Sequence, residues 1–169
     1  MNFADTNWLE ALYVTPHPDD AAARERERIV ERFVRKHGGQ LAVSPVVLLE
    51  ARNVFSRVTG ESQPREWGLV EADFDGRLYV DPMNWNLLRR DCEALFARYA
   101  WKVTLGTFDA AIVASARLAG ATCFLSFDTT AKVNWHRSAE GHWSRDSVSS
   151  CWQSRRLRCL PAVRGPAQP

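Results

Sequence analysis

The sequence predicts an α/β domain in which helices pack on a central parallel sheet. Two observations lead to this prediction. Short apolar segments with strand character alternate with longer segments whose apolar residues recur at helical spacing, which is the pattern of parallel sheets. Turn and capping residues also separate these segments, so each can form one element. With 169 residues, 46% of them hydrophobic, the chain has about the size and core content of one compact domain.

Four strands and six helices are expected along the chain. The second helix can be capped by Asp19 or Asp20 and is stopped by a Gly-Gly pair. The third begins at Ser44-Pro45, where a capping hydroxyl precedes a proline in the first turn. Thr107 can cap the last helix, and a glycine closes it. The expected strands are residues 2–4, 41–43, 78–80 and 122–126, and the expected helices are residues 8–13, 20–37, 45–58, 63–73, 88–99 and 107–119.

The pattern breaks after residue 133, which divides the chain into a domain at 1–133 and a tail at 134–169. The first part carries a net charge of −2 and the tail +4, so a slightly acidic domain precedes a basic segment. The tail shows no hydrophobic period, and we expect it to be poorly ordered. A zinc site built from the two histidines and two cysteines of the tail is disfavoured, because their spacing matches no common finger.

Nothing in the sequence predicts a membrane or secreted protein. No run of about 18 apolar residues exists, so a transmembrane helix is not expected. The first residues lack the basic and apolar regions of a signal peptide. The four cysteines form no C-x-x-C pair and are expected to be free thiols. We therefore expect a cytoplasmic protein.

Four carboxylates far apart in the sequence are expected at one edge of the sheet. Asp5 follows the first strand and Asp128 follows the fourth, while Glu50 lies early in the helix after the second strand. Asp109 lies in the first turn of the helix that leads to the fourth strand, where the helix dipole favours its charge. In parallel sheets, ligands bind at this carboxyl edge.

Clustered carboxylates repel one another, and a cation is the usual means of neutralising them. An all-oxygen site suits Mg²⁺ or Mn²⁺ rather than Zn²⁺. Each acid also has a purely structural explanation: Asp5 as a helix cap, Asp109 as a dipole partner, Asp128 as a turn residue and Glu50 as a solvated side chain.

Four sequence motifs, in the same order along the chain, resemble those of PIN-domain ribonucleases, especially the VapC-type toxins of bacterial toxin–antitoxin systems. They are Asp5-Thr6-Asn7, the segment SPVVLLEARN at residues 44–53, the segment TFDAAIVASA at 107–116 and the segment FLSFD at 124–128. The resemblance spans residues 1–133. It implies a three-layer α/β/α fold with a central parallel sheet of four to five strands.

The resemblance also implies a function. Such proteins are Mg²⁺- or Mn²⁺-dependent ribonucleases whose partners are RNA and a small antitoxin protein, and a homodimer is compatible with the family. By position, Asp5, Glu50, Asp109 and Asp128 would be the catalytic and metal-binding acids. Their supporting residues would be Thr6, Asn53 and Ser126.

Two features depart from the family pattern. Ile112 stands where many relatives carry histidine, but it belongs to the packing side of its helix, so little effect is expected. The tail lacks the short helix and fifth strand with which relatives usually end, and residues 157–160 are a poor substitute strand.

Other functions remain open from the sequence. A degenerate PIN-fold protein could bind an antitoxin without cleaving RNA. A receiver domain would need an acidic pair after the first strand, and a haloacid-dehalogenase-like phosphatase would need a second Asp at position 7, where the chain has Asn7.

Overall fold

The computed structural model describes residues 1–38, 40–74, 76–100, 106–127, 136–137 and 143–144. Its main sheet contains β1 (Asn2–Ala4), β2 (Leu41–Val43), β3 (Leu78–Val80) and β4 (Cys123–Leu125), all parallel and in the order β3-β2-β1-β4. Phe3 pairs with Ala42 on one side and with Phe124 on the other. The four strands are those expected from the sequence, with β4 shorter by one residue at each end.

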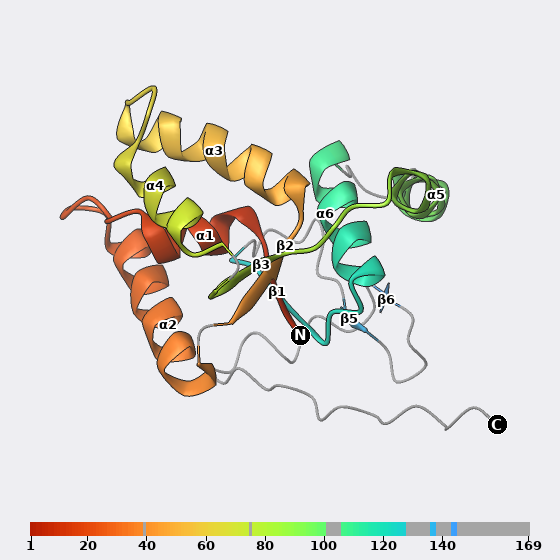
Figure 1. Ribbon diagram of the computed structural model, residues 1–169, viewed down its shortest axis with the longest axis horizontal. Helices are drawn as coiled ribbons and strands as arrows, with labels where there is room; N and C mark the ends of the chain where they lie inside the picture. Colours follow the sequence, from red (N-terminus) through yellow and green to blue (C-terminus); the bar gives the residue numbers. More distant parts are fainter. Residues whose placement is uncertain (39, 75, 101–105, 128–135, 138–142, 145–169) are drawn as a thin grey trace.

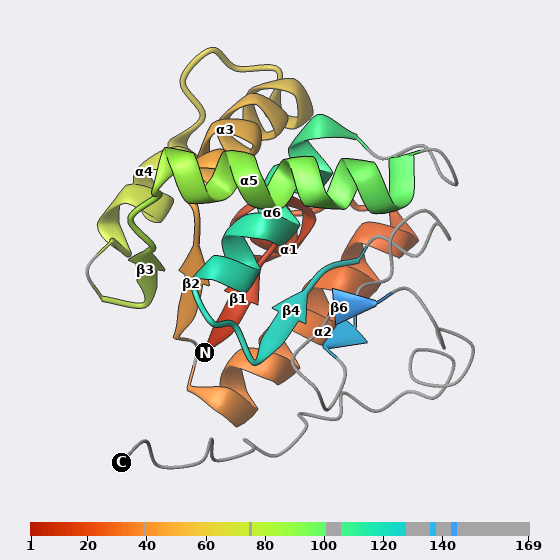
Figure 2. The same cartoon turned by 90° about the vertical axis from the view of Figure 1, so that its right-hand side faces the viewer.

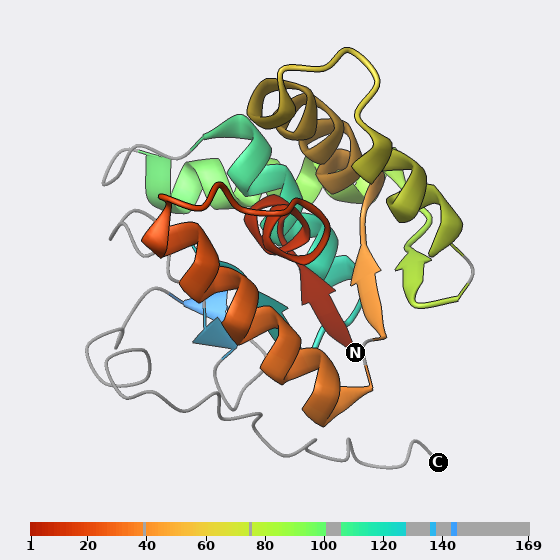
Figure 3. The same ribbon diagram turned by 90° about the vertical axis from the view of Figure 1, so that its left-hand side faces the viewer.

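Helices cover both faces of this sheet, which gives the three layers that the sequence predicts. Figure 3 shows α1 and α2 in front of one face, and Figure 2 shows α5 and α6 in front of the other. In Figure 1, α3 lies along the upper end of the sheet and contacts both α1 and α6. The helices are α1 (Thr6–Tyr13), α2 (Ala21–His37), α3 (Pro45–Thr59), α4 (Arg65–Ala72), α5 (Trp85–Leu95), the π-helical turn η1 (Phe96–Ala100) and α6 (Thr107–Leu118).

Most helix ends follow the expected capping chemistry. The Asp20 carboxylate caps α2 by accepting from Ala23 N at 2.8 Å, and Gly38, with a φ of 77°, is the C-cap that follows His37. Ser44 Oγ caps α3 by accepting from Val47 N. The expectation for Thr107 was wrong: Thr107 is the first residue of α6, and Gly106 occupies the N-cap without a side-chain cap. A threonine beside a glycine does not determine which of the two residues takes the cap position.

The core lies on both faces of the sheet. One cluster joins the four strands, the first four helices and part of α6, and a second joins α5, η1 and other residues of α6. Trp8 links the elements at the α1 face, since it stacks on Phe127 at 4.9 Å and meets Phe33 edge-on at 5.3 Å. Ile112 is only 2% exposed, which confirms that its position on α6 serves packing.

The tail contains two described strands, β5 (His136–Arg137) and β6 (Trp143–Ser144), which pair antiparallel. The expectation of a poorly ordered tail and the alternative strand at 157–160 otherwise fall outside the described residues. In the described part of the chain, no helix is both long and apolar enough to cross a membrane. Cys92 and Cys123 are half-buried, and the other two cysteines lie outside the described residues.

Candidate functional site

The carboxyl edge of β1 and β4 forms the centre of the site. The two strands continue in register one residue beyond their ends, because Asp5 N donates to Leu125 O at 2.9 Å. This bond places Asp5 directly beside Ser126. Asp5 is also the N-cap of α1, so the chain turns from strand to helix at this residue. The structural role that the sequence suggested for Asp5 is therefore real, and it fixes the carboxylate at the sheet edge.

Both oxygens of the Asp5 carboxylate accept a hydrogen bond. Thr6 N donates to Oδ1 at 2.7 Å, and Ser126 Oγ donates to Oδ2 at 2.7 Å. Each bond uses one lone pair and holds the carboxylate in a single orientation. Because a carboxylate has about four acceptor positions, these two bonds leave others for a further ligand.

Asn7 ties the segment after β4 to the start of α1. Its Oδ1 accepts from Phe127 N at 2.9 Å, and its Nδ2 donates to Ser126 Oγ at 3.2 Å. The side chain thereby positions the serine that holds Asp5. Asn7 belongs to the first sequence motif, but no role was predicted for it. These partners lie about 120 residues further along the chain, so no local sequence signal could have indicated this role.

Thr6 connects α1 to α3. Its buried hydroxyl donates a hydrogen bond to Glu50 Oε2, so the first residue of one helix orients the carboxylate of the other. Thr6 was expected to support the acids, and it does contact Glu50. Asn53, expected in a similar role, lies exposed one helical turn beyond Glu50 and takes no part in the hydrogen bonds among the described site residues.

Burial raises the pKa of the Asp5 carboxyl from its ordinary 3.8 to about 6, because desolvation penalises the charged form. The hydrogen bonds from Ser126 and Thr6 oppose this shift, and the negative charges of Glu50 and Asp109 add to it. Burial is thus a larger cause of this shift than the repulsion between carboxylates that their clustering implies.

Asp109 lies exposed in the first turn of α6, as expected. Its charge acts on Asp5 across the edge of the sheet. The negative charges of Glu50 and Asp109 therefore both act on the Asp5 carboxyl. Asp128, the fourth acid, lies outside the described residues. Within the described part of the chain, no three His, Cys, Asp or Glu side chains stand close enough to hold an ion by themselves.

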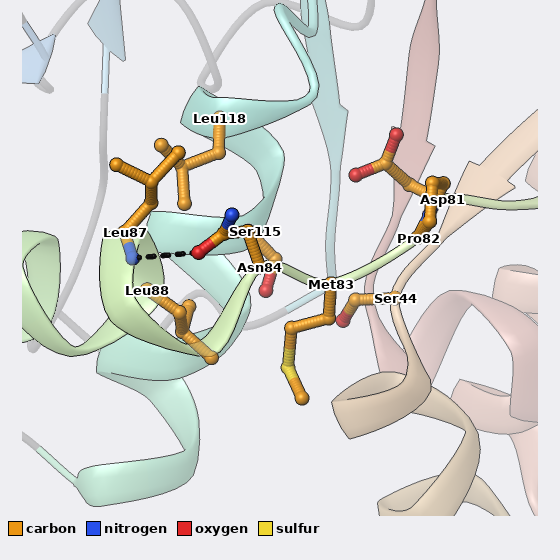
Figure 4. A pocket seen from close by; sticks show the side chains of 9 residues that line it. All are labelled: Ser44, Asp81, Pro82, Met83, Asn84, Leu87, Leu88, Ser115 and Leu118. Carbon is orange, nitrogen blue, oxygen red and sulfur yellow. Dashed lines mark hydrogen bonds between the residues drawn. The ribbon is translucent and has the colours of Figure 1, made fainter.

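A separate hollow of about 210 Å³ lies at the ends of β2 and β3, and Figure 4 shows it between α6 and the start of α5. Asp81 is among its residues, and burial raises the pKa of that carboxyl. Asn84 caps α5 at its rim, accepting from Leu87 N at 3.1 Å. Asp5, Glu50 and Asp109 do not line this hollow, so it is distinct from the acidic edge where these three residues lie.

Comparisons with known proteins identify the family. The protein is an α/β domain with a parallel four-stranded sheet and a group of acidic residues at one edge of that sheet. The PIN domain family matches residues 3–133, so the chain belongs to that family. This assignment excludes the receiver-domain and phosphatase interpretations. A search of curated protein sequences finds no match.

Solved structures share this fold. The VapC20 toxin of Mycobacterium tuberculosis, described as a sarcin–ricin loop cleaving toxin, is 19% identical with a TM-score of 0.60. The alignment covers 77% of this chain and 92% of that toxin. VapBC2 from Rickettsia felis, bound to a DNA fragment from its promoter, is 15% identical with a TM-score of 0.52, covering 74% and 86% of the two chains.

Proposed function

We propose that this chain is a metal-dependent endoribonuclease and the toxin of a toxin–antitoxin pair. The observation that carries the proposal is the state of Asp5. Its carboxylate is buried at the sheet edge, held by two hydrogen bonds and subject to the charges of Glu50 and Asp109. A protein that needed Asp5 only as a helix cap would gain nothing from placing two more acids near it. An acidic edge that binds a cation accounts for all three.

The residues fit Mg²⁺ or Mn²⁺ in their chemistry. Every donor is a carboxylate or hydroxyl oxygen, which these ions prefer. A divalent cation would also favour the ionised form of Asp5 and so oppose the effect of burial. Asp5, Glu50 and Asp109 do not stand close enough to hold an ion by themselves, so we propose that they hold it together with Asp128 and partly through its waters. Such an ion keeps several of its waters, so the protein need not supply every ligand.

The reaction would be hydrolysis of an RNA phosphodiester bond. When bound, the ion would supply a more acidic water and positive charge for the phosphate. Asp5 contributes a carboxylate of fixed orientation, because Thr6 N and Ser126 Oγ hold both oxygens. The Thr6 hydroxyl holds Glu50 in the same way. These bonds pre-organise the acids, which lowers the cost of arranging them at the moment of reaction.

The RNA substrate and the protein partner proposed for this chain rest on its structural similarity to solved structures. The similar structures include a toxin that cleaves the sarcin–ricin loop and a VapBC complex. We propose RNA as substrate and a small antitoxin protein as partner for this chain on that analogy.

Cleavage of RNA by the purified chain, with and without Mg²⁺ or Mn²⁺, tests the function. Asp109→Asn should abolish cleavage while leaving the circular dichroism spectrum unchanged, because it removes a charged ligand from an exposed position but keeps the volume. Asp20→Asn is the matched control: Asp20 also lies at the start of a helix, α2, but it is exposed and does not act on Asp5. It should cleave like the wild type.

Two results would count against the proposal. Equal cleavage by wild type and Asp109→Asn would remove that residue from the site. A folded wild-type protein that binds Mn²⁺ and an antitoxin but cleaves no RNA would favour the degenerate toxin instead.

A further inference from the structure

Gly106 leaves the space that the Asp109 carboxylate occupies. A Cβ atom built on Gly106 would lie 2.6 Å from Asp109 Oδ2 and 3.3 Å from its Cγ. Among the described residues, no side chain other than that of Asp109 approaches this closely. The Asp109 side chain therefore folds back toward the residue that precedes its own helix.

The backbone does not require a glycine at this position. Gly106 has a φ of −65° and a ψ of 146°, an extended conformation that any residue adopts. It is the N-cap of α6, where serine, threonine, aspartate and asparagine are at least as favourable and would add a capping bond. Since neither backbone geometry nor capping explains the glycine, the close approach of Asp109 is the remaining reason for it.

We propose that Gly106 is a positioning residue for Asp109, and that its missing side chain sets where the Asp109 carboxylate lies at the acidic edge. This inference rests on the proposed function, because it assigns Gly106 a role in the same metal site. It concerns the placement of a ligand and not direct contact with the ion or the RNA.

The size of the displacement follows from the distances. Ordinary contact begins at 3.4 Å, so an alanine methyl at position 106 would have to push Asp109 Oδ2 away by roughly 0.8 Å from its 2.6 Å position. Metal–ligand distances tolerate about 0.2 Å. The carboxylate oxygen would thus move by several times this tolerance, and a misplacement of about 1 Å can cost about 100-fold in rate.

The same substitution should cost the fold little. The crowded atom is the far end of an exposed, rotatable side chain, and the backbone angles suit alanine. Gly68 supplies the matched control. It lies inside α4, and a Cβ added there would meet nothing within 4 Å. Gly68→Ala therefore makes the same chemical change without touching the acidic edge.

The test is Mn²⁺ binding by the full chain, measured by titration calorimetry without RNA. Five proteins are compared: wild type, Gly106→Ala, Gly68→Ala, Asp109→Asn, and the Gly106→Ala/Asp109→Asn double variant. We expect Gly106→Ala to weaken Mn²⁺ binding about 10- to 100-fold, the range seen when ligand-orienting groups are removed. Gly68→Ala should bind like the wild type. The double variant should bind no more weakly than Asp109→Asn alone, because the methyl then has no ligand to displace.

Thermal melting without metal serves as the second readout. A purely structural role for Gly106 would lower the melting temperature and leave the metal affinity of the folded protein unchanged, which would overturn the proposal. Full additivity of the two substitutions in Mn²⁺ affinity would overturn it as well. If the wild type itself binds no Mn²⁺, both the proposed metal site and the proposed role of Gly106 are refuted. If the wild type binds Mn²⁺ and Gly106→Ala binds it with equal affinity, only the proposed role of Gly106 is refuted.

Discussion

Replacement of Asp5 by asparagine should make the metal-free protein more stable at neutral pH. Burial raises the pKa of this carboxyl from 3.8 to about 6, so the folded state holds its proton more tightly than the unfolded state does. The wild type therefore loses stability as the pH rises from about 4 to about 6, and the loss stays constant at higher pH. Asparagine carries no charge at any of these pH values and avoids the loss.

The magnitude follows from the two pKa values. A gap of about 2 units corresponds to about 3 kcal/mol at pH 8, when Asp5 is ionised in both states. At pH 5 the folded state is still largely protonated, and the same pKa values give only about 1.5 kcal/mol. Asparagine keeps the volume of aspartate and caps helices equally well, so the capping bond to Thr6 N should survive.

Urea unfolding followed by circular dichroism, at pH 5 and pH 8 in chelator, measures this effect. The advantage of Asp5→Asn over the wild type should grow by about 1.5 kcal/mol between the two pH values. Asp20→Asn, which alters the exposed cap of α2, should stay within about 0.5 kcal/mol of the wild type at both. An Asp5→Asn protein whose advantage is absent at pH 8, or equal at both pH values, would refute the reasoning.

Three further predictions concern the metal, the hydrogen bonds and the tail. Millimolar Mg²⁺ or Mn²⁺ should raise the melting temperature of the wild type by several degrees, because an intact site binds the ion preferentially when folded. The melting temperature of Asp5→Asn should rise much less. An unchanged wild-type melting temperature would count against the site. Thr6→Val should lower RNA cleavage at least about 10-fold, since Glu50 loses the hydroxyl that orients it. Thr6→Ser keeps the hydroxyl and should retain most activity. A similar loss of activity in both variants would show that the hydroxyl does not orient Glu50 for cleavage. Removal of residues 134–169 should cost little stability in urea unfolding, and aggregation of the truncated protein would instead indicate that the tail covers a sheet edge.

The sequence was sufficient to predict the sheet because its strands and caps are local signals. Ser44 with the following proline, and Asp20 before an amphipathic segment, each specify a helix start within a few residues. These helix starts do not depend on distant parts of the chain. The pairing of β1 with β4, which places Asp5 and Ser126 side by side, joins residues about 120 positions apart and is not a local signal.

Features that depend on tertiary contacts could not be predicted in the same way. The bonds of Asn7 to Ser126 and Phe127 join residues about 120 positions apart, so no local pattern specifies them. The exposure of Asn53 depends on how α3 is rotated, which the helical wheel alone leaves undetermined. The space at Gly106 exists only because the Asp109 side chain folds back, a rotamer that the sequence does not encode by itself.

The most direct test of the central claim is the chemistry of the RNA product. Cleavage in ¹⁸O-labelled water, followed by mass spectrometry of the fragments, reports which oxygen attacks the phosphorus. If water attacks it as proposed, wild-type protein with Mg²⁺ or Mn²⁺ should yield linear phosphate ends that carry one labelled oxygen, and no 2′,3′-cyclic phosphate. Asp5→Asn should yield no fragments. Fragments that end in unlabelled cyclic phosphate, or that form equally well in chelator, would contradict a metal-dependent ribonuclease at this acidic edge.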